Sequence, residues 1–236
     1  MLFNQLVPPT NRLLDFLPIS DYRRLILKCE SVEQMPNDVL NNAGDKILHV
    51  YFPTQCIISL MKHIDVDKGL EVGMIGNEGM LGSTLLLGVD TSPFTAVIQQ
   101  AGITLRMPTK TFTYELEQSV VFQKLIKRYA KVLFSQLVQN AACTRFHVVE
   151  SRLARLLLMI RDRSQSQCFH ITQETLAQKL GVRRVGVTKA ACTLQHKMLI
   201  SYSRGDIVIQ DNAGLEALSC SCYQTDNETY SRIFHG

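Results

Sequence analysis

Cationic and hydroxyl side chains gather on one short segment in the C-terminal half of the chain. Arg183, Arg184, Thr188 and Lys189 occur there, with Val185 between them. An arginine can donate two parallel hydrogen bonds to guanine O6 and N7, and a valine can contact a thymine methyl group. Lysine, arginine and threonine side chains also bind phosphates, which gives affinity for any duplex. These residues predict a surface that reads duplex DNA.

Two helices joined by a tight turn would present these side chains outward. Thr172 can cap the first helix, in which Leu176 and Leu180 share one face. Gly181 can take the positive φ that ends a helix abruptly. The second helix then has its own apolar face, formed by Val187, Ala190, Ala191 and Leu194. This arrangement is typical of a DNA-binding helix-turn-helix.

A hairpin over residues 199–209 follows the second helix, with Arg204 and Gly205 at its turn. The alternative interpretation of the two helices is a pair of packed core helices with a solvated basic face. A hairpin in this position indicates the wing of a winged helix and favours the DNA-binding interpretation. Arg204 therefore joins Thr172 and the residues of the second helix as a candidate DNA contact.

The net charge of the chain is concentrated in the same region. The formal charge is +4, and residues 1–144 balance to zero. Between Arg152 and Arg204 the only acids are Asp162 and Glu174. The bases in that stretch are Arg152, Arg155, Arg161, Arg163, Lys179, Arg183, Arg184, Lys189, Lys197 and Arg204. A polyanionic partner for this half explains the asymmetry, and ordinary variation in surface charge is the alternative.

Composition predicts a soluble cytoplasmic protein, because 46% of its residues are hydrophobic and 19% are charged. No run approaches the ~20 apolar residues needed to cross a bilayer, so we expect no membrane contact. The first nine residues lack the basic segment followed by an apolar segment that an export signal would contain. Without export, the seven scattered cysteines are expected to stay reduced. No catalytic triad, paired carboxylates or phosphate-binding loop occurs, which predicts that the protein is not an enzyme.

The rest of the chain divides into three regions by its periodicity. Residues 11–16 and 20–29 indicate short helices, the second behind Ser20 and Asp21. Short, often alternating runs at 47–52, 56–61, 70–74, 95–99 and 103–107 predict a compact antiparallel barrel or roll. From residue 113 to 163 the spacing becomes helical, with a second helix starting at 148.

Apolar residues recur every three or four positions along the first of these helices. They are Phe122, Leu125, Tyr129, Val132, Leu133 and Leu137, together with Gln136. Such a stripe favours a long dimerisation helix. A helix packed on its own barrel would show the same spacing, so the periodicity leaves both open.

Residues 44–47, 51–53, 56–59, 76–82 and 87–88 resemble the cyclic-nucleotide-binding β-roll. With the long helix and the C-terminal winged helix, residues 13–209 resemble the bacterial Crp/Fnr superfamily of transcription regulators. The resemblance implies an α+β fold that comprises a β-roll sensor domain with N-terminal helices (1–112), a long dimerisation helix (113–146) and a winged helix-turn-helix (147–236). It also implies a homodimer on palindromic promoter DNA, an effector site in the roll, and RNA polymerase as a candidate partner.

The recognition helix departs from the pattern of the superfamily, which begins with Arg-Glu and has a second arginine four residues after the glutamate. Here these positions hold Arg184, Val185 and Lys189. Val185 cannot accept a hydrogen bond from cytosine as glutamate would. We therefore expect the two-fold mode of binding to be kept and the half-site sequence to differ.

The effector region also departs from the nucleotide-binding pattern. In such members a Gly-Glu turn and an arginine-containing segment surround the cyclic phosphate. Here Glu78 and Gly79 form a rearranged first half, and Phe94, before Thr95, stands where arginine is expected. Because a buried phosphate needs a paired charge, we expect an effector domain that does not bind cyclic AMP.

Metal and redox roles are alternatives with less support. Cys29 is the only cysteine before residue 50, so the N-terminal cluster of iron-sulfur members is missing. His49, Cys56 and His63 are candidate haem ligands, each expected to be an ordinary buried or exposed side chain. Cys220-Ser-Cys222 could chelate a metal or act as a redox switch, but without further close ligands we expect no metal and no cofactor.

The sequence thus predicts a homodimeric, sequence-specific DNA-binding transcription regulator. Two other classes remain open. One is a ligand-binding module that controls a protein partner, and the other is a cysteine-based redox or metal sensor.

Overall fold

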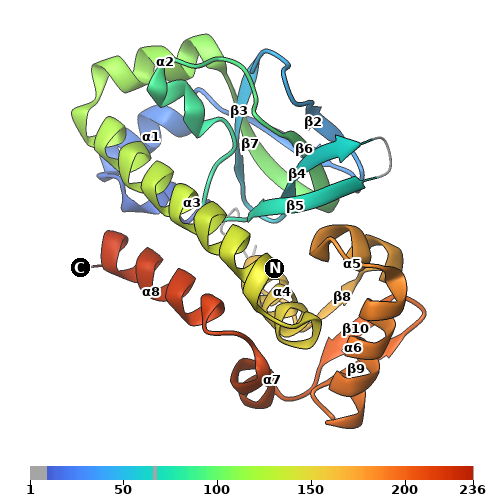
Figure 1. The fold of residues 1–236 in the computed structure, drawn as a ribbon. Coiled ribbons are helices and arrows are strands. Elements are labelled where there is room, and N and C mark those ends of the chain that lie inside the picture. Colours follow the sequence, from blue (N-terminus) through green and yellow to red (C-terminus); the bar gives the residue numbers. More distant parts are fainter. Residues whose placement is uncertain (1–9, 66–67, 236) are drawn as a thin grey trace, which may run out of the picture.

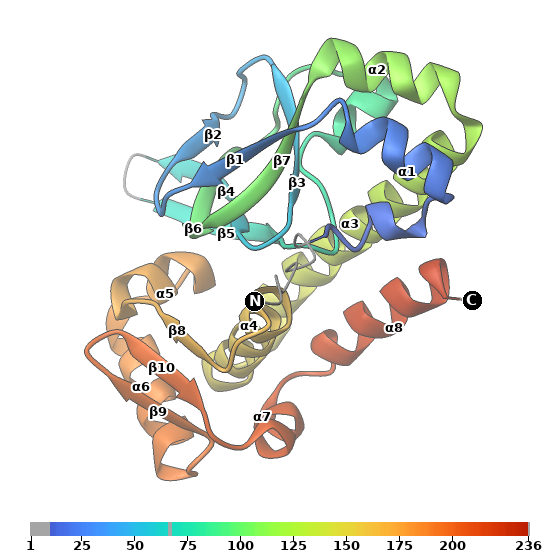
Figure 2. The same cartoon turned by 180° about the vertical axis from the view of Figure 1, so that it is seen from behind.

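The computed structural model describes residues 10–65 and 68–235. Figures 1 and 2 show a β-roll with covering helices, a long helix α3 that leaves it, and a small unit with its own sheet at the other end. The expected α+β fold is confirmed. The expectation about an export signal concerns residues 1–9, which lie outside the described part of the chain. No helix of the described residues is long and apolar enough to span a bilayer.

The N-terminal region contains helix and strand. A 3-10 helix, η1 (Leu14–Phe16), precedes α1 (Ile19–Ile26), close to the predicted ranges. Pro18, not Ser20, occupies the position before α1. Strands β1 (Glu30–Gln34) and β2 (Val39–Asn41) follow, and the sequence analysis missed both. β1 is mostly exposed and polar at the edge of its sheet, so it lacks an alternating apolar pattern.

The roll consists of two antiparallel sheets, as the alternating runs predicted. The order is β1-β7-β3 in one sheet and β2-β6-β4-β5 in the other. The remaining strands are β3 (His49–Pro53), β4 (Ile57–Asp65), β5 (Lys68–Ile75), β6 (Thr95–Gln100) and β7 (Gly102–Pro108). A short η2 (Ser83–Leu87) lies between β5 and β6. Alternate side chains such as Ile58, Leu60, Ala96 and Ile98 are buried in the core between the sheets.

The segment expected to form one long helix from residue 113 is two helices. α2 (Thr109–Gln118) ends at Ser119, which has extended backbone angles, and α3 (Val120–Phe146) begins there. The Ser119 hydroxyl accepts a hydrogen bond from the Phe122 amide at 3.2 Å, so it caps α3. Helical periodicity continues through the break, which is why the sequence did not reveal it.

The predicted apolar stripe of α3 packs inside its own chain. Phe122, Leu125, Tyr129 and Leu133 are buried in the same core as the roll. Packing on its own barrel therefore accounts for the spacing of these residues, which agrees with the second of the two alternatives, and dimerisation through α3 stays a prediction. Another face of α3 is exposed and apolar, with Phe134 at 67% exposure and Val138 at 55%.

The C-terminal part begins with α4 (Val149–Ser164), close to the predicted second helix. The helix-turn-helix is α5 (Gln173–Leu180) and α6 (Arg184–His196). Its sheet has the order β8-β10-β9, with β8 (Cys168–His170), β9 (Ile200–Ser203) and β10 (Asp206–Ile209). The predicted hairpin is β9 and β10, and β8 is an addition. α7 (Asn212–Leu218) and α8 (Cys222–Phe234) follow.

Helix α8 turns away from the winged helix and lies along α3, as both views show. Its far end reaches the N-terminal segment, where the rings of Phe16 and Phe234 stack at 4.9 Å. Tyr230 donates a hydrogen bond to the carbonyl of Glu78 at 3.1 Å. The C-terminal helix thus connects the long helix, the N-terminal segment and a turn of the roll.

Candidate nucleic-acid interface

The turn between α5 and α6 has the geometry that its residues predicted. The Thr172 hydroxyl accepts a hydrogen bond from the Thr175 amide at 3.1 Å, so it caps α5. Gly181 ends α5 with φ +61°, and the next amide, of Val182, bonds to the carbonyl of Ala177 at 3.0 Å. A Cβ at Gly181 would lie 2.8 Å from the Leu70 side chain of β5, so glycine also permits close packing against the roll.

Helix α6 is positioned by its apolar face. Val187, Ala190, Ala191 and Leu194 are buried in the core of the winged helix, as predicted. This core also contains Leu176 of α5. Because this face is buried, the opposite face of α6 points toward solvent. The 3.6-residue repeat of the helix determines which side chains lie on each face.

The exposed face of α6 carries the predicted DNA contacts. Arg183, Arg184 and Lys189 are exposed, and Val185 is 64% exposed beside them. Thr188 differs, because its side chain is half-buried and its hydroxyl donates to Gln173 Oε1 at 2.8 Å. That bond joins α5 to α6, so Thr188 positions the recognition helix and has less freedom to bind a phosphate.

The wing places one more cation beside this helix. Arg204 is exposed in the tight turn between β9 and β10, where it adopts φ +52°. A groove between the wing and α6 is lined by both Arg184 and Arg204. Burial raises the pKa of Tyr202 in the wing, and its protonated hydroxyl donates to the Ile171 carbonyl at 3.2 Å. The wing is therefore tied to Ile171, the residue before the cap of α5.

The positive charge of this region has two roles. Five of the cations bind groups within the chain: Arg152, Arg155, Arg161, Arg163 and Lys179. The interpretation of the entire excess as a surface for a polyanion is therefore wrong for these five. The other five, namely Arg183, Arg184, Lys189, Lys197 and Arg204, are exposed and form no ion pair among the described residues.

Two of the internal cations connect the winged helix to the roll. The Lys179 ammonium in α5 is buried and donates to Glu71 of β5, to Ser59 at 2.6 Å and to Gln99 at 2.9 Å. Arg163 Nε in α4 lies 2.9 Å from Glu78 Oε1. The N–H is not aimed at this oxygen, so the pair is held by charge rather than by a hydrogen bond.

The four predicted effector residues do not line one cavity. Phe94 lines a mostly apolar cavity between the roll and α3, together with Leu81, Leu133 and Phe134. Glu78 faces Arg163 instead. Gly79 lies against Tyr129, whose hydroxyl would be 2.3 Å from an added Cβ. The Thr95 hydroxyl accepts a bond from the Ala43 amide at 3.3 Å.

A group of residues at the other end of α3 was not predicted from the sequence. Cys143 and His147 lie next to Cys220 and Cys222. The expectation that Cys220 and Cys222 have no further close ligands is therefore wrong. The spacing of four residues between Cys143 and His147, which places both on one side of a helix, was the available signal.

Comparison with known proteins agrees with this geometry. Residues 151–218 match the family described as the Crp-like helix-turn-helix domain. The c-di-GMP responsive global regulator CLP of Xanthomonas campestris is similar in structure, at 14% identity over 82% of this chain and 100% of that chain, with a TM-score of 0.67. FixK2 of Bradyrhizobium japonicum is similar at 12% identity over 81% and 98% of the two chains, with a TM-score of 0.69.

A protein assigned to the Crp/Fnr family of transcriptional regulators, from Eubacterium rectale, has 16% identity over 87% of this chain and 96% of that chain, with a TM-score of 0.68. No curated protein matches the chain.

The β-roll, the long helix and the winged helix-turn-helix together support a DNA-binding regulator. The chain has the fold of the Crp/Fnr regulators, and its residues 151–218 are a Crp-like helix-turn-helix domain. The resemblance indicated by the sequence is thereby confirmed. The matched family and structures are regulators and not enzymes, in agreement with the sequence analysis.

Proposed function

We propose that the protein is a homodimeric regulator that binds a two-fold symmetric promoter site through α6 and the wing. The observation that carries the proposal is the exposed row of Arg183, Arg184, Val185 and Lys189 on a helix whose opposite face is buried. A helix held in this way can enter the major groove with its first turn against base edges. RNA polymerase is the further partner that a promoter-bound regulator would contact.

Each exposed side chain has a proposed role on the duplex. Arg184, on the groove between α6 and the wing, donates bidentately to guanine, while Val185 contacts a thymine methyl group. Arg183 precedes the first turn of α6 and binds phosphate, and Lys189, six residues further along, binds another phosphate. Arg204 of the wing contacts the DNA backbone next to the base contacts of α6. Thr172 and Thr188 hold α5 and α6 in place.

The second copy of the chain is proposed to pack on the exposed apolar face of α3. Phe134 and Val138 are one helical turn apart on that face and are more than half exposed. Two copies of α3 packed through this face would make the two-fold coiled-coil contact that a symmetric DNA site requires. We also propose that the sensor domain ends at residue 112 and that the DNA-binding domain begins after residue 146, with the dimerisation helix between them.

The cavity beside Phe94 is the proposed effector site. Its lining includes Ile47, Ile75, Leu81 and Phe134, and among the described residues it includes no lysine or arginine. An apolar lining does not offset the free energy lost when a charged phosphate is removed from water. An uncharged, apolar small molecule is therefore the class of effector that fits, and cyclic AMP does not.

Genomic footprinting tests the proposal. Sheared DNA from the source genome is selected on the purified protein, and the protected positions are mapped. We expect protected sites of two inverted half-sites whose centres are about one helical turn, roughly 34–36 Å, or a multiple of it apart. Absence of any enriched sequence at low salt would contradict the proposal and would favour a module that controls a protein partner.

A further inference from the structure

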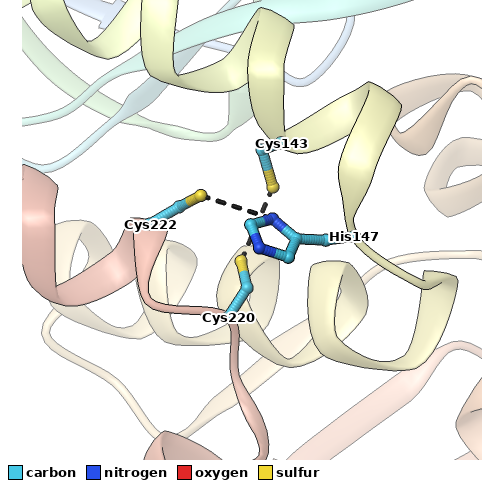
Figure 3. Close-up of side chains that lie close together, drawn as sticks. All are labelled: Cys143, His147, Cys220 and Cys222. Carbon is cyan, nitrogen blue, oxygen red and sulfur yellow. Dashed lines mark hydrogen bonds between the residues drawn. The ribbon is translucent and has the colours of Figure 1, made fainter.

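Four side chains that can bind metals meet where α3, α4 and α8 come together (Figure 3). Cys143 lies in the last turn of α3, and His147 follows directly as the residue that ends it. Cys220 precedes α8, and Cys222 is its first residue. The three cysteines are at most 6% exposed and form a buried cluster of their own.

The geometry of these four side chains matches a single tetrahedral ion. One ligand atom from each residue can be chosen so that all four lie within 4.8 Å of one another. Cys143 Sγ and Cys220 Sγ are 3.5 Å apart, and Cys222 Sγ is 3.5 Å from His147 Nδ1. Around zinc, with bonds of about 2.3 Å to sulfur and 2.0–2.1 Å to nitrogen, ligand atoms lie roughly 3.5–3.8 Å apart. Small shifts of side chains would therefore bring all four atoms to one ion.

The surroundings supply the groups that a thiolate-rich site needs. Gln139 Nε2 donates to Cys222 Sγ at 2.9 Å. Three thiolates and one divalent ion carry a net charge of −1. Arg155 is already paired with Asp226, whereas buried Arg152 lines the same cavity as Cys143 and forms no ion pair among the described residues, so its charge can balance the site. Hydrogen-bonded outer groups of this kind orient the ligands of a metal.

The ligand set distinguishes among metals and cofactors. Thiolates with one imidazole select zinc and other thiophilic ions rather than magnesium or calcium. In a 4Fe–4S cluster each ligand binds a different iron, and in a 2Fe–2S cluster two ligands bind each of two irons. Either cluster would separate the four ligand atoms further than in this group, where all lie within 4.8 Å of one another. Four protein ligands also leave no open position for a substrate, as in structural zinc sites.

We propose that Cys143, His147, Cys220 and Cys222 form a structural site for one zinc ion. The ion would join the start of α8 to the junction of α3 and α4. Because α4 leads into the winged helix and α3 leads from the roll, the site fixes the connection between sensor and DNA-binding unit.

Zinc content of the full-length reduced protein tests the proposal. The protein is incubated with Zn²⁺ and passed through a desalting column, and the metal is measured by mass spectrometry. We expect one zinc per chain in the wild type and in Cys168→Ser, a matched exposed cysteine on β8. Cys222→Ser and His147→Ala should lose most of the bound metal. A wild type that retains no zinc, or variants that retain it in full, would overturn the proposal.

Cobalt substitution of the wild type gives an independent readout that does not depend on the folding of a variant. Tetrahedral cobalt with thiolate ligands should produce intense visible bands and a sulfur-to-cobalt charge-transfer band, both lost on adding excess zinc. A pale octahedral spectrum, or a Cys143–Cys220 disulfide in freshly purified protein without metal, would contradict the site. DNA binding can persist in either case, so failure here is distinct from failure of the proposed function.

Discussion

Lys179 of the helix-turn-helix forms a buried ion pair with Glu71 of the roll. Lys179 also donates to Ser59 and Gln99, so all three hydrogen atoms of its ammonium group have an acceptor. The pair connects α5 and β5, whose residues are 108 positions apart in the chain. In this arrangement the roll and the winged helix form one packed body.

Removal of the Glu71 carboxylate should be strongly destabilising, because it leaves a buried ammonium without a counter-charge. We expect Glu71→Ala to lower the free energy of unfolding by about 3–5 kcal/mol. The measurement is urea unfolding followed by circular dichroism, since the chain has no tryptophan. Glu71→Leu combined with Lys179→Met should recover most of the loss. A loss below about 1 kcal/mol, typical of exposed pairs, would contradict the buried pair.

Arg184 should determine sequence preference, whereas Arg183 should determine affinity for any duplex. Arg184→Ala is expected to weaken the free energy of binding to the preferred site by roughly 1–3 kcal/mol and to change binding to random DNA little. Arg183→Ala should weaken binding to both about equally. Fluorescence anisotropy with the two duplexes measures both affinities, and Arg232→Ala, at an exposed arginine of α8, is the control. If Arg184→Ala leaves the ratio of the two affinities unchanged, its assignment to a base is wrong.

Much of the fold could be predicted from the sequence, because alternation marks the strands of the roll and the helical repeat marks α4 to α6. The break at Ser119 and the edge strand β1 could not be predicted. Ser119 interrupts a continuous helical period, and β1 has few apolar residues to alternate.

The exposed cations on α6 were predictable because the apolar positions Val187, Ala190 and Leu194 define the opposite face. Contacts between segments that are distant in the sequence could not be predicted. Neither the pairing of Lys179 with Glu71 nor the approach of Cys143 to Cys220 has a local pattern, because both depend on how the elements pack.

The exposed face of α3 should be the dimer contact. Val138→Asp is expected to weaken self-association by about 2 kcal/mol or more, which is roughly a 30-fold increase in the dissociation constant. Leu27→Asp makes the same kind of change at an exposed leucine beyond α1 and should leave the dimer unchanged. Sedimentation equilibrium measures both variants. A wild type that is monomeric at micromolar concentration would disprove this contact.

Cyclic AMP and cyclic GMP should not bind. Phe94 lines the cavity, and no described lining residue offers a cation to a phosphate. A missing charge-assisted bond to a buried phosphate costs on the order of 2 kcal/mol or more, over tenfold in affinity. Isothermal titration calorimetry with both nucleotides is the measurement. Micromolar binding of either would show that another residue, such as Arg106, serves as the cation, although Arg106 now pairs with Glu30 at 2.5 Å.

The dependence of DNA affinity on salt tests the central claim most directly, namely that α6 and the wing neutralise phosphates of a duplex. Affinity for the footprinted site is measured by anisotropy over a series of salt concentrations. If Arg183, Lys189 and Arg204 of both copies each bind one phosphate, the slope of log K against log salt should be about −5. A slope near zero, or no binding at low salt, would contradict the assignment of this surface to DNA.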